Sequence, residues 1–179
     1  MTPKDKERRA DALYYDTSIK RYHLCQMVVN REGDLDAILS PAAIAYSLDE
    51  GAFEPIRAHQ TDAGADLRTP FGFTLPPHGS MDVDTGVHVE LPRGTCARVE
   101  PKSGLNVNGG IVAWGLIDEG YSGSIVVKLY NLGKLCHYFD RGDKIAQLTV
   151  SPVLYPAFER VGEVRGGERG SSGFGSTGR

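Results

Sequence analysis

The chain has 179 residues, a formal net charge of −3 and an ordinary hydrophobic content of 40%. This length fits one domain with an appendage. The weak acidity excludes the basic surface of a nucleic-acid-binding protein, so we expect no direct nucleic-acid contact. The polar residues 1–7 do not resemble a signal peptide, and no apolar run approaches the roughly 20 residues of a membrane helix. We therefore expect a cytoplasmic protein without membrane contact.

The cysteines and histidines argue against a disulfide framework and a zinc site. The three cysteines, at positions 25, 96 and 136, lie far apart and are expected to be reduced thiols. The five histidines show no i, i+4 pair or other spacing typical of metal ligands.

The chain changes character near residue 53. Residues 1–52 form an N-terminal extension that we expect to be partly helical. Residues 41–48 (PAAIAYSL) suit a short helix with Ser40 as its N-cap. Residues 12–29 fit either a helix or a strand, so their structure stays open.

Residues 53–161 carry the pattern of an all-β core. Residues 81, 83, 87, 89 and 91 are hydrophobic at alternate positions, which predicts one face of a strand. Further short extended runs lie at 96–99, 125–130 and 145–150, separated by turns that contain proline or glycine. Many short strands at close spacing favour a β-sandwich or jelly roll over alternating βαβ units.

Residues 162–179 form a glycine-rich C-terminal segment whose large apolar side chains are Val164 and Phe174. Such a segment buries too little apolar surface to offset the entropy of ordering, so we expect a mobile lid that a ligand orders. Residues 173–178 match G-x-G-x-x-G, but this segment lacks the strand before it and the helix after it that a dinucleotide-binding turn requires.

Four core segments carry polar and charged groups that make sense together. Residues 61–67 place the carboxylate of Asp66 after a glycine turn. Residues 101–105 place a cation, a hydroxyl and backbone N–H groups in one short turn, which suits phosphate oxygens. Residues 115–123 predict a β-hairpin with a carboxylate and an aromatic ring at its tip, and residues 142–148 lead a strand that carries the amide of Gln147.

Together with residues 169–177, these segments resemble the five motifs of the trimeric dUTPase family, in order and over about residues 55–179. The resemblance implies a jelly-roll homotrimer in which all three chains build each active site. It also implies hydrolysis of dUTP to dUMP and pyrophosphate by attack of water on the α-phosphate, assisted by Mg²⁺.

The resemblance assigns a role to each motif. Asp118 is the general base that activates the water, and Tyr121 packs under the deoxyribose, leaving no room for a 2′-hydroxyl. Backbone groups around Leu116 and Ile117 read the uracil edge. The phosphates are bound by Lys102, Ser103, Gly104 and Gln147.

The remaining roles concern the metal and the lid. Asp66 holds Mg²⁺ through water, as suits a hard oxygen ligand. Arg169 acts like an arginine finger on the γ-phosphate, and Phe174 stacks on the uracil. The terminal phosphates are gripped by Gly175, Ser176 and Thr177.

Three features depart from the family pattern. Lys102 stands where arginine is commoner, which keeps the charge but loses the bidentate fork. Residues 106–114 are about one residue short, which leaves the base-reading residues there open, and Trp114 is expected to pack rather than stack. Ser171 and Ser172 stand where glycine or an acid is common.

Two alternative functions are compatible with parts of this sequence. A dCTP deaminase shares this fold, but by resemblance its catalytic glutamate falls at the position of Lys128, and a protonated lysine cannot act as a general base. A regulatory protein is the second alternative, in which lid closure switches a protein partner bound through the N-terminal extension.

Overall fold

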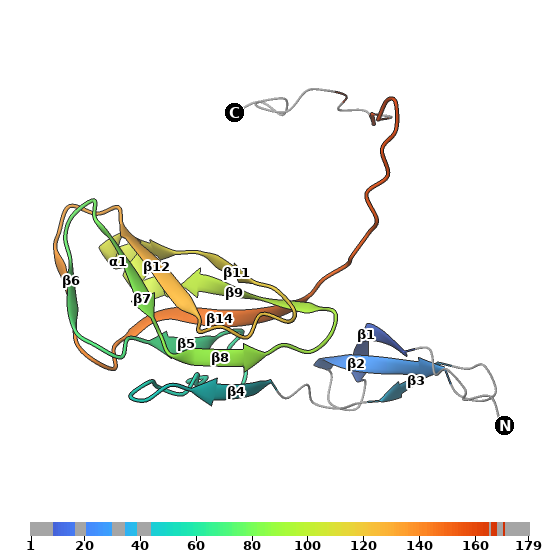
Figure 1. Cartoon of the computed structure of the whole chain (residues 1–179), viewed down its shortest axis with the longest axis horizontal. Coiled ribbons are helices and arrows are strands. Elements are labelled where there is room, and N and C mark those ends of the chain that lie inside the picture. The colour runs from blue at the N-terminus through green and yellow to red at the C-terminus, as the bar shows by residue number, and fades with distance from the viewer. Residues whose placement is uncertain are drawn as a thin grey trace.

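The computed structural model describes residues 9–16, 21–29, 35–38, 44–164, 166–167 and 170 (Figure 1). Over these residues the chain forms fourteen strands and one short helix, which confirms the all-β expectation. The first strands are β1 (Arg9–Asp16), β2 (Arg21–Val29), β3 (Leu35–Ile38), β4 (Ala45–Leu48), β5 (Ala65–Arg68), β6 (Phe73–Leu75), β7 (Ser80–Asp84) and β8 (Val87–Glu90). Then come β9 (Thr95–Pro101), α1 (Ser103–Gly109), β10 (Ile111–Ala113), β11 (Gly115–Ile117), β12 (Val126–Asn131), β13 (His137–Phe139) and β14 (Lys144–Pro152).

Two larger sheets enclose the hydrophobic core. One has the strand order β11-β9-β14-β5 and the other the order β10-β12-β7. Burial alternates along the strands as the period of a half-buried strand requires: in β12, Val127 and Leu129 are buried whereas Val126 and Tyr130 are exposed. Buried side chains of both sheets belong to the same core cluster, so the core is a β-sandwich.

The single strand expected over residues 81–91 is two strands, β7 and β8, although the alternation of buried side chains continues through both. The break falls at Gly86, which has a φ of 66°, a conformation that favours glycine. At the break, the Thr85 hydroxyl donates a 2.7 Å hydrogen bond to the Ile125 carbonyl. The break lets β7 pair with β12 while β8 pairs with β4.

The helix expected over residues 41–48 is wrong for residues 45–48, whereas residues 41–43 and Ser40 lie outside the described residues. Residues 45–48 are strand β4, which pairs antiparallel with β8 from Ala45↔Glu90 to Leu48↔Val87. The local pattern of these residues suits a helix about as well as a strand. Backbone hydrogen bonds to the edge of β8 decide in favour of the strand. Residues 9–16, 21–29 and 35–38 form an antiparallel sheet of order β1-β2-β3, so the described parts of the extension are strands.

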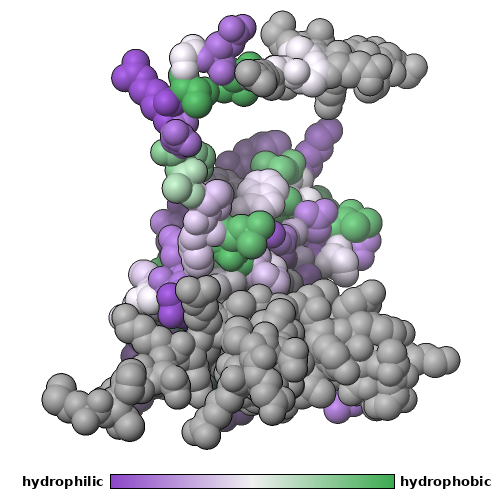
Figure 2. Space-filling model, turned by 90° about the vertical axis from the view of Figure 1, so that its right-hand side faces the viewer, coloured by the Kyte–Doolittle hydropathy of each residue, from purple (hydrophilic) through white to green (hydrophobic). Residues whose placement is uncertain are grey.

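After β14 the chain leaves the core as an extended segment (Figure 1). Leu154 and Phe158 in this segment are 90% and 101% exposed. Figure 2 shows hydrophobic side chains at the surface of both the core and this segment. The part of the chain that the structure describes contains no helix long and apolar enough to cross a membrane.

Candidate active site

The third motif lines a cavity of about 300 Å³. Its walls come from β9, β11, the following turn and the start of β12. The residues that line it are Val99, Gly115, Leu116, Ile117, Asp118, Tyr121, Ser124, Ile125 and Val126. All four residues predicted from this motif, namely Leu116, Ile117, Asp118 and Tyr121, therefore lie at one cavity.

The cavity exists because the expected hairpin over residues 115–123 does not form. β11 pairs with β9, whereas β12 pairs with β7 and β10, so the two strands enter different sheets. β11 is the outer strand of its sheet, so one side of its backbone is not used by β9. The space between the diverging strands is the cavity.

The turn at the cavity places the Tyr121 ring and the Asp118 carboxylate. The Tyr121 amide donates to the Asp118 carbonyl at 3.1 Å, and Gly120 takes a φ of 85°. The Tyr121 hydroxyl donates to the Ser124 carbonyl at 3.0 Å, which fixes the ring against the turn. A Cβ on Gly123 would overlap this hydroxyl, so the close approach requires glycine there. The Asp118 side chain is exposed.

A second cluster joins the first, second and fourth motifs. β14 pairs with β5 on one side and β9 on the other, which sets Gln147 opposite both Asp66 and Glu100. The Asp66 carboxylate is ion-paired with Lys102 and, at 2.6 Å, with Lys144. The Gln147 amide donates to the Pro101 carbonyl at 3.1 Å. Three segments distant in sequence thus converge on one buried carboxylate and two ammonium groups.

The two lysines control the charge of Asp66. Burial raises the pKa of this carboxyl, but the hydrogen bonds and charges of Lys102 and Lys144 outweigh burial and hold its pKa below the ordinary 3.8. Asp66 is therefore ionised at neutral pH. It positions two cations next to the second motif, residues 101–105.

The second motif is the start of a helix and not the short turn expected from the sequence. Ser103 and Gly104 open α1, and Gly110 ends it in the left-handed conformation. Both opening residues are exposed, and the first N–H groups of a helix have no partner within it. The segment thus still presents a hydroxyl and backbone donors beside Lys102.

Two residues of this cluster were missed in the sequence. Lys144 opens the fourth motif, and its positive charge was the available signal. Gly64 lies so close to Gln147 that a Cβ there would stand 2.8 Å from the glutamine Oε1. The absence of a side chain at Gly64, two residues before Asp66, therefore leaves room for Gln147 beside the cluster.

The two clusters lie far apart within one chain. Ile117 pairs with Ala97, so Asp118 follows next to the start of β9, whereas Lys102 follows the end of β9. The positions of Asp118 and Lys102 along β9 therefore differ by six residues of extended strand, which is a distance of roughly 20 Å. Asp118 and Lys102 of the same chain therefore cannot both touch one triphosphate group.

Lys128 lies on β12 opposite Asp82 of β7. Its ammonium group is 2.9 Å from the Asp82 carboxylate. The hydrogen bond to this carboxylate raises the pKa of Lys128 above its ordinary value. A lysine held in its protonated form cannot accept a proton, which argues against the deaminase alternative.

The lid residues lie outside the described residues. They are Arg169, Phe174, Gly175, Ser176 and Thr177. Trp114, expected to pack, is 63% exposed in the single chain. Cys96 and Cys136 are free thiols, whereas the side chain of Cys25 lies outside the part that the structure describes.

Comparison with known proteins gives a consistent result. The family model described as dUTPase matches residues 52–178. The mitochondrial deoxyuridine 5'-triphosphate nucleotidohydrolase of Homo sapiens is 42% identical over 133 residues, covering 74% of this chain and 53% of that protein. The enzyme of the same name from Clostridium novyi is 41% identical, covering 73% and 94%. This chain thus spans about half of the human relative and nearly all of the clostridial one.

Solved structures agree with the sequence relatives. A Staphylococcus bacteriophage 80alpha dUTPase with dUpNHpp is 27% identical with a TM-score of 0.68, covering 77% of this chain and 99% of that one. A mutant dUTPase from phage phi11 of S. aureus, described for its coordination of a structural Mg(II) ion, is 25% identical with a TM-score of 0.64, covering 69% and 99%. The sandwich and its two clusters place this protein in the structural class of these all-β dUTPases. Because the family model matches most of the sequence, the chain belongs to the dUTPase family.

Proposed function

We propose that this protein hydrolyses dUTP to dUMP and pyrophosphate. The observation that carries the proposal is the cavity of the third motif, which holds a carboxylate, an aromatic ring and the outer edge of a strand. Relatives whose names state the same activity match over nearly three quarters of the chain.

The cavity suits a deoxyuridine. The unpaired side of β11 at Leu116 and Ile117 offers backbone donors and acceptors to the uracil edge, as a strand edge does for a peptide. The Tyr121 ring packs against the deoxyribose and excludes a 2′-hydroxyl. Asp118 accepts a proton from the water that attacks the α-phosphorus, and the bound geometry lowers the barrier by holding that water in line.

The second cluster suits the phosphates. Lys102 supplies charge, while Ser103, Gly104 and Gln147 supply hydrogen bonds. From the lid, Arg169 adds charge at the γ-phosphate, Phe174 stacks on the uracil, and Gly175, Ser176 and Thr177 close on the terminal phosphates. The lid residues are assigned by the family motif that they match.

The donor set fits Mg²⁺ bound mainly by the substrate. The described residues contain no group of three histidine, cysteine or acidic side chains that could hold a metal. Mg²⁺ commonly takes one or two carboxylates together with phosphate oxygens and several waters, and Asp66 would hold it through water. When bound, Mg²⁺ neutralises charge on the phosphates.

We further propose a homotrimer with shared active sites. The separation of roughly 20 Å between Asp118 and Lys102 along β9 supports a site in which these two residues come from different copies. Exposed apolar side chains on the core, including Trp114 and Val126, supply surface for the contact between copies.

We propose three parts for the chain. The extended pairing of β4 with β8 supports a core that starts near residue 44, earlier than the boundary at residues 52–53 expected from the sequence. The core ends with β14 at Pro152, earlier than the boundary at residue 161 expected from the sequence. Residues 153–161 lead from the core to the lid, which residues 162–179 form.

Pyrophosphate release from dUTP, dTTP, dCTP and UTP with Mg²⁺ tests the activity. We expect a strong preference for dUTP, and we expect Asp118→Asn to lose turnover while it still binds dUTP. Glu119→Gln is the matched control, because its carboxylate binds the Gly94 amide and the Tyr155 hydroxyl, 2.7 and 2.8 Å away, instead of facing substrate. Full activity of Asp118→Asn, or equal rates with dUTP and UTP, would contradict the proposal.

A further inference from the structure

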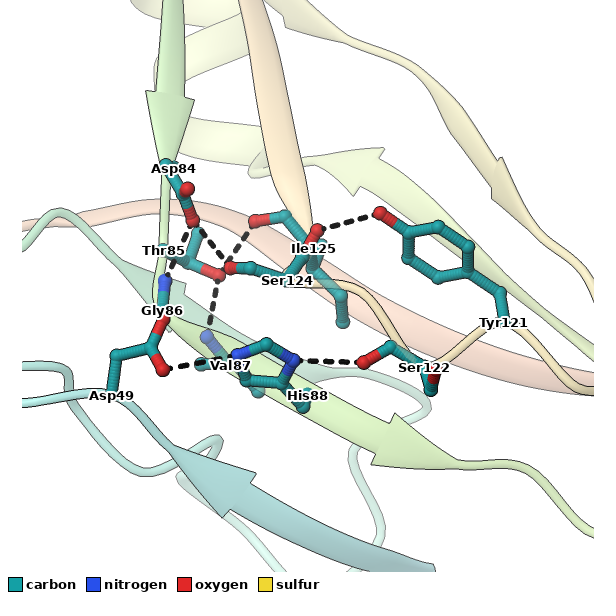
Figure 3. Close-up of polar contacts among 10 residues, drawn as sticks. All are labelled: Asp49, Asp84, Thr85, Gly86, Val87, His88, Tyr121, Ser122, Ser124 and Ile125. Carbon is teal, nitrogen blue, oxygen red and sulfur yellow. Dashed lines mark hydrogen bonds and ion pairs between the residues drawn. The ribbon is translucent and has the colours of Figure 1, made fainter.

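His88 of β8 connects three elements (Figure 3). Its Nδ1 lies 2.9 Å from the Ser122 carbonyl, in the loop that carries Tyr121. Its Nε2 lies 3.2 Å from the Asp49 carboxylate, which follows β4. Asp49 precedes the residues that the family model matches, so this contact joins an added segment to the third motif.

Both ring nitrogens of His88 face acceptors. A neutral imidazole has a single N–H, so it can donate to either the carbonyl or the carboxylate but not to both. The imidazolium form has two N–H groups and satisfies both partners at once. The geometry therefore favours the charged ring.

The opposite end of the loop is held differently. The Ser124 hydroxyl donates to the Asp84 carboxylate, which also accepts from the Gly86 amide at 3.0 Å. The Tyr121 hydroxyl in turn donates to the Ser124 carbonyl. Loss of the His88 contact would therefore free the Ser122 side of the loop, next to Tyr121, while Ser124 stays attached.

We propose that His88 is a pH-dependent positioning residue that holds residues 121–124 so that Tyr121 closes on the deoxyribose of the substrate. This inference rests on the proposed function. His88 itself does not line the cavity of the third motif, so it acts through Ser122 and Tyr121.

The charges around His88 agree with this role. The hydrogen bond to the Ser122 carbonyl, followed by that to Asp49 and the charges of Asp49 and Asp84, raises the pKa of His88 above 6.5. Tyr46 of β4 and Glu90 of β8 line the groove that His88 shares. A group whose pKa is raised by folding loses its stabilising contact as the pH rises through the folded-state pKa. The His88 bridge between Asp49 and Ser122 is therefore complete while the ring is charged, and at high pH the neutral ring keeps at most one of its two hydrogen bonds.

Steady-state kinetics with dUTP and UTP between pH 6 and pH 9 test the inference. In the wild type, the KM for dUTP should rise about fivefold through the His88 titration, the scale of one typical intramolecular hydrogen bond, while kcat changes little. The preference for dUTP over UTP should fall as this KM rises. His88→Gln should show neither change with pH, and Asp49→Asn should move the midpoint to lower pH. His78→Asn, on an exposed turn, is the control and should behave as the wild type.

A second readout does not depend on turnover. Hydrogen exchange of residues 121–124 should quicken above the His88 pKa, beyond the intrinsic pH effect, in the wild type and should show no such step in His88→Gln. The inference is overturned if His88→Gln keeps the wild-type rise in KM, or if the exchange step is the same in both proteins. If the wild type releases no pyrophosphate, that result contradicts the proposed function and not the role of His88. The hydrogen-exchange measurement then still tests whether His88 holds residues 121–124.

Discussion

Replacing Asp66 by asparagine keeps the shape of the side chain and removes the charge that holds two ammonium groups. The Asp66 side chain is 9% exposed, and those of Lys102 and Lys144 are 28% and 36% exposed. Surface ion pairs contribute about 0–1 kcal/mol, whereas breaking a buried pair costs about 3–5 kcal/mol. Because the carboxylate is buried and both lysines are partly solvated, we expect about 1 kcal/mol per pair and a loss of about 2 kcal/mol in the free energy of unfolding.

The effect must depend on pH in a definite direction. The pKa of Asp66 lies below 3.8 in the folded protein, so its contribution is present above that value. It is lost as the pH falls through the lowered folded-state pKa. The difference between the wild type and Asp66→Asn should therefore be constant near neutral pH and shrink in acid.

Urea unfolding at one fixed protein concentration measures this difference, since the stability of an oligomer depends on concentration. Asp62→Asn is the matched control. Its carboxylate pairs with His59, whose side chain is 81% exposed, so this substitution should leave the free energy of unfolding nearly unchanged. An Asp66→Asn protein as stable as the wild type at pH 7, or a deficit that persists unchanged in acid, would refute this account of the cluster.

Three further predictions follow from the lid, the core and the deaminase alternative. Deleting residues 169–179 should lower kcat for dUTP by about 10³-fold, the scale of an arginine finger, without a change in the unfolding temperature measured by calorimetry. Asn131→Asp should cost at least about 3 kcal/mol in urea unfolding, because the buried Asn131 amide donates to the carbonyls of Leu75, Pro76 and Leu135, which a carboxylate cannot do. Lys128→Ala should leave dUTP turnover near the wild-type value, and neither protein should release ammonia from dCTP in a coupled assay.

The alternation of hydrophobic residues predicted the all-β class, because burial on one face of a strand imposes a period of two that is visible locally. It did not reveal the break at Gly86, since the side-chain phase continues through the break. Residues 45–48 were assigned to a helix for a related reason. Their pattern is compatible with either structure, and the free edge of β8 decides the outcome.

The motifs identified the residues of the candidate site but not their arrangement. Nothing in the local sequence of residues 115–123 shows that β11 and β12 enter different sheets, and this divergence creates the cavity. The contact between His88 and Asp49 joins residues 39 positions apart, so no local pattern announces it. Lys144 could have been found, because its charge opens a motif already assigned to phosphate binding.

The shared active site is tested most directly by mixing two inactive proteins. Asp118→Asn and the double variant Lys102→Ala, Ser103→Ala are each expected to release almost no pyrophosphate from dUTP. Coexpressed with different tags and purified through both, they form mixed oligomers. If Asp118 and Lys102 of one site come from different copies of a trimer, one of the three sites in each doubly purified mixed trimer is intact, and about a third of the wild-type activity should return. A mixed protein no more active than its two parents would contradict the account.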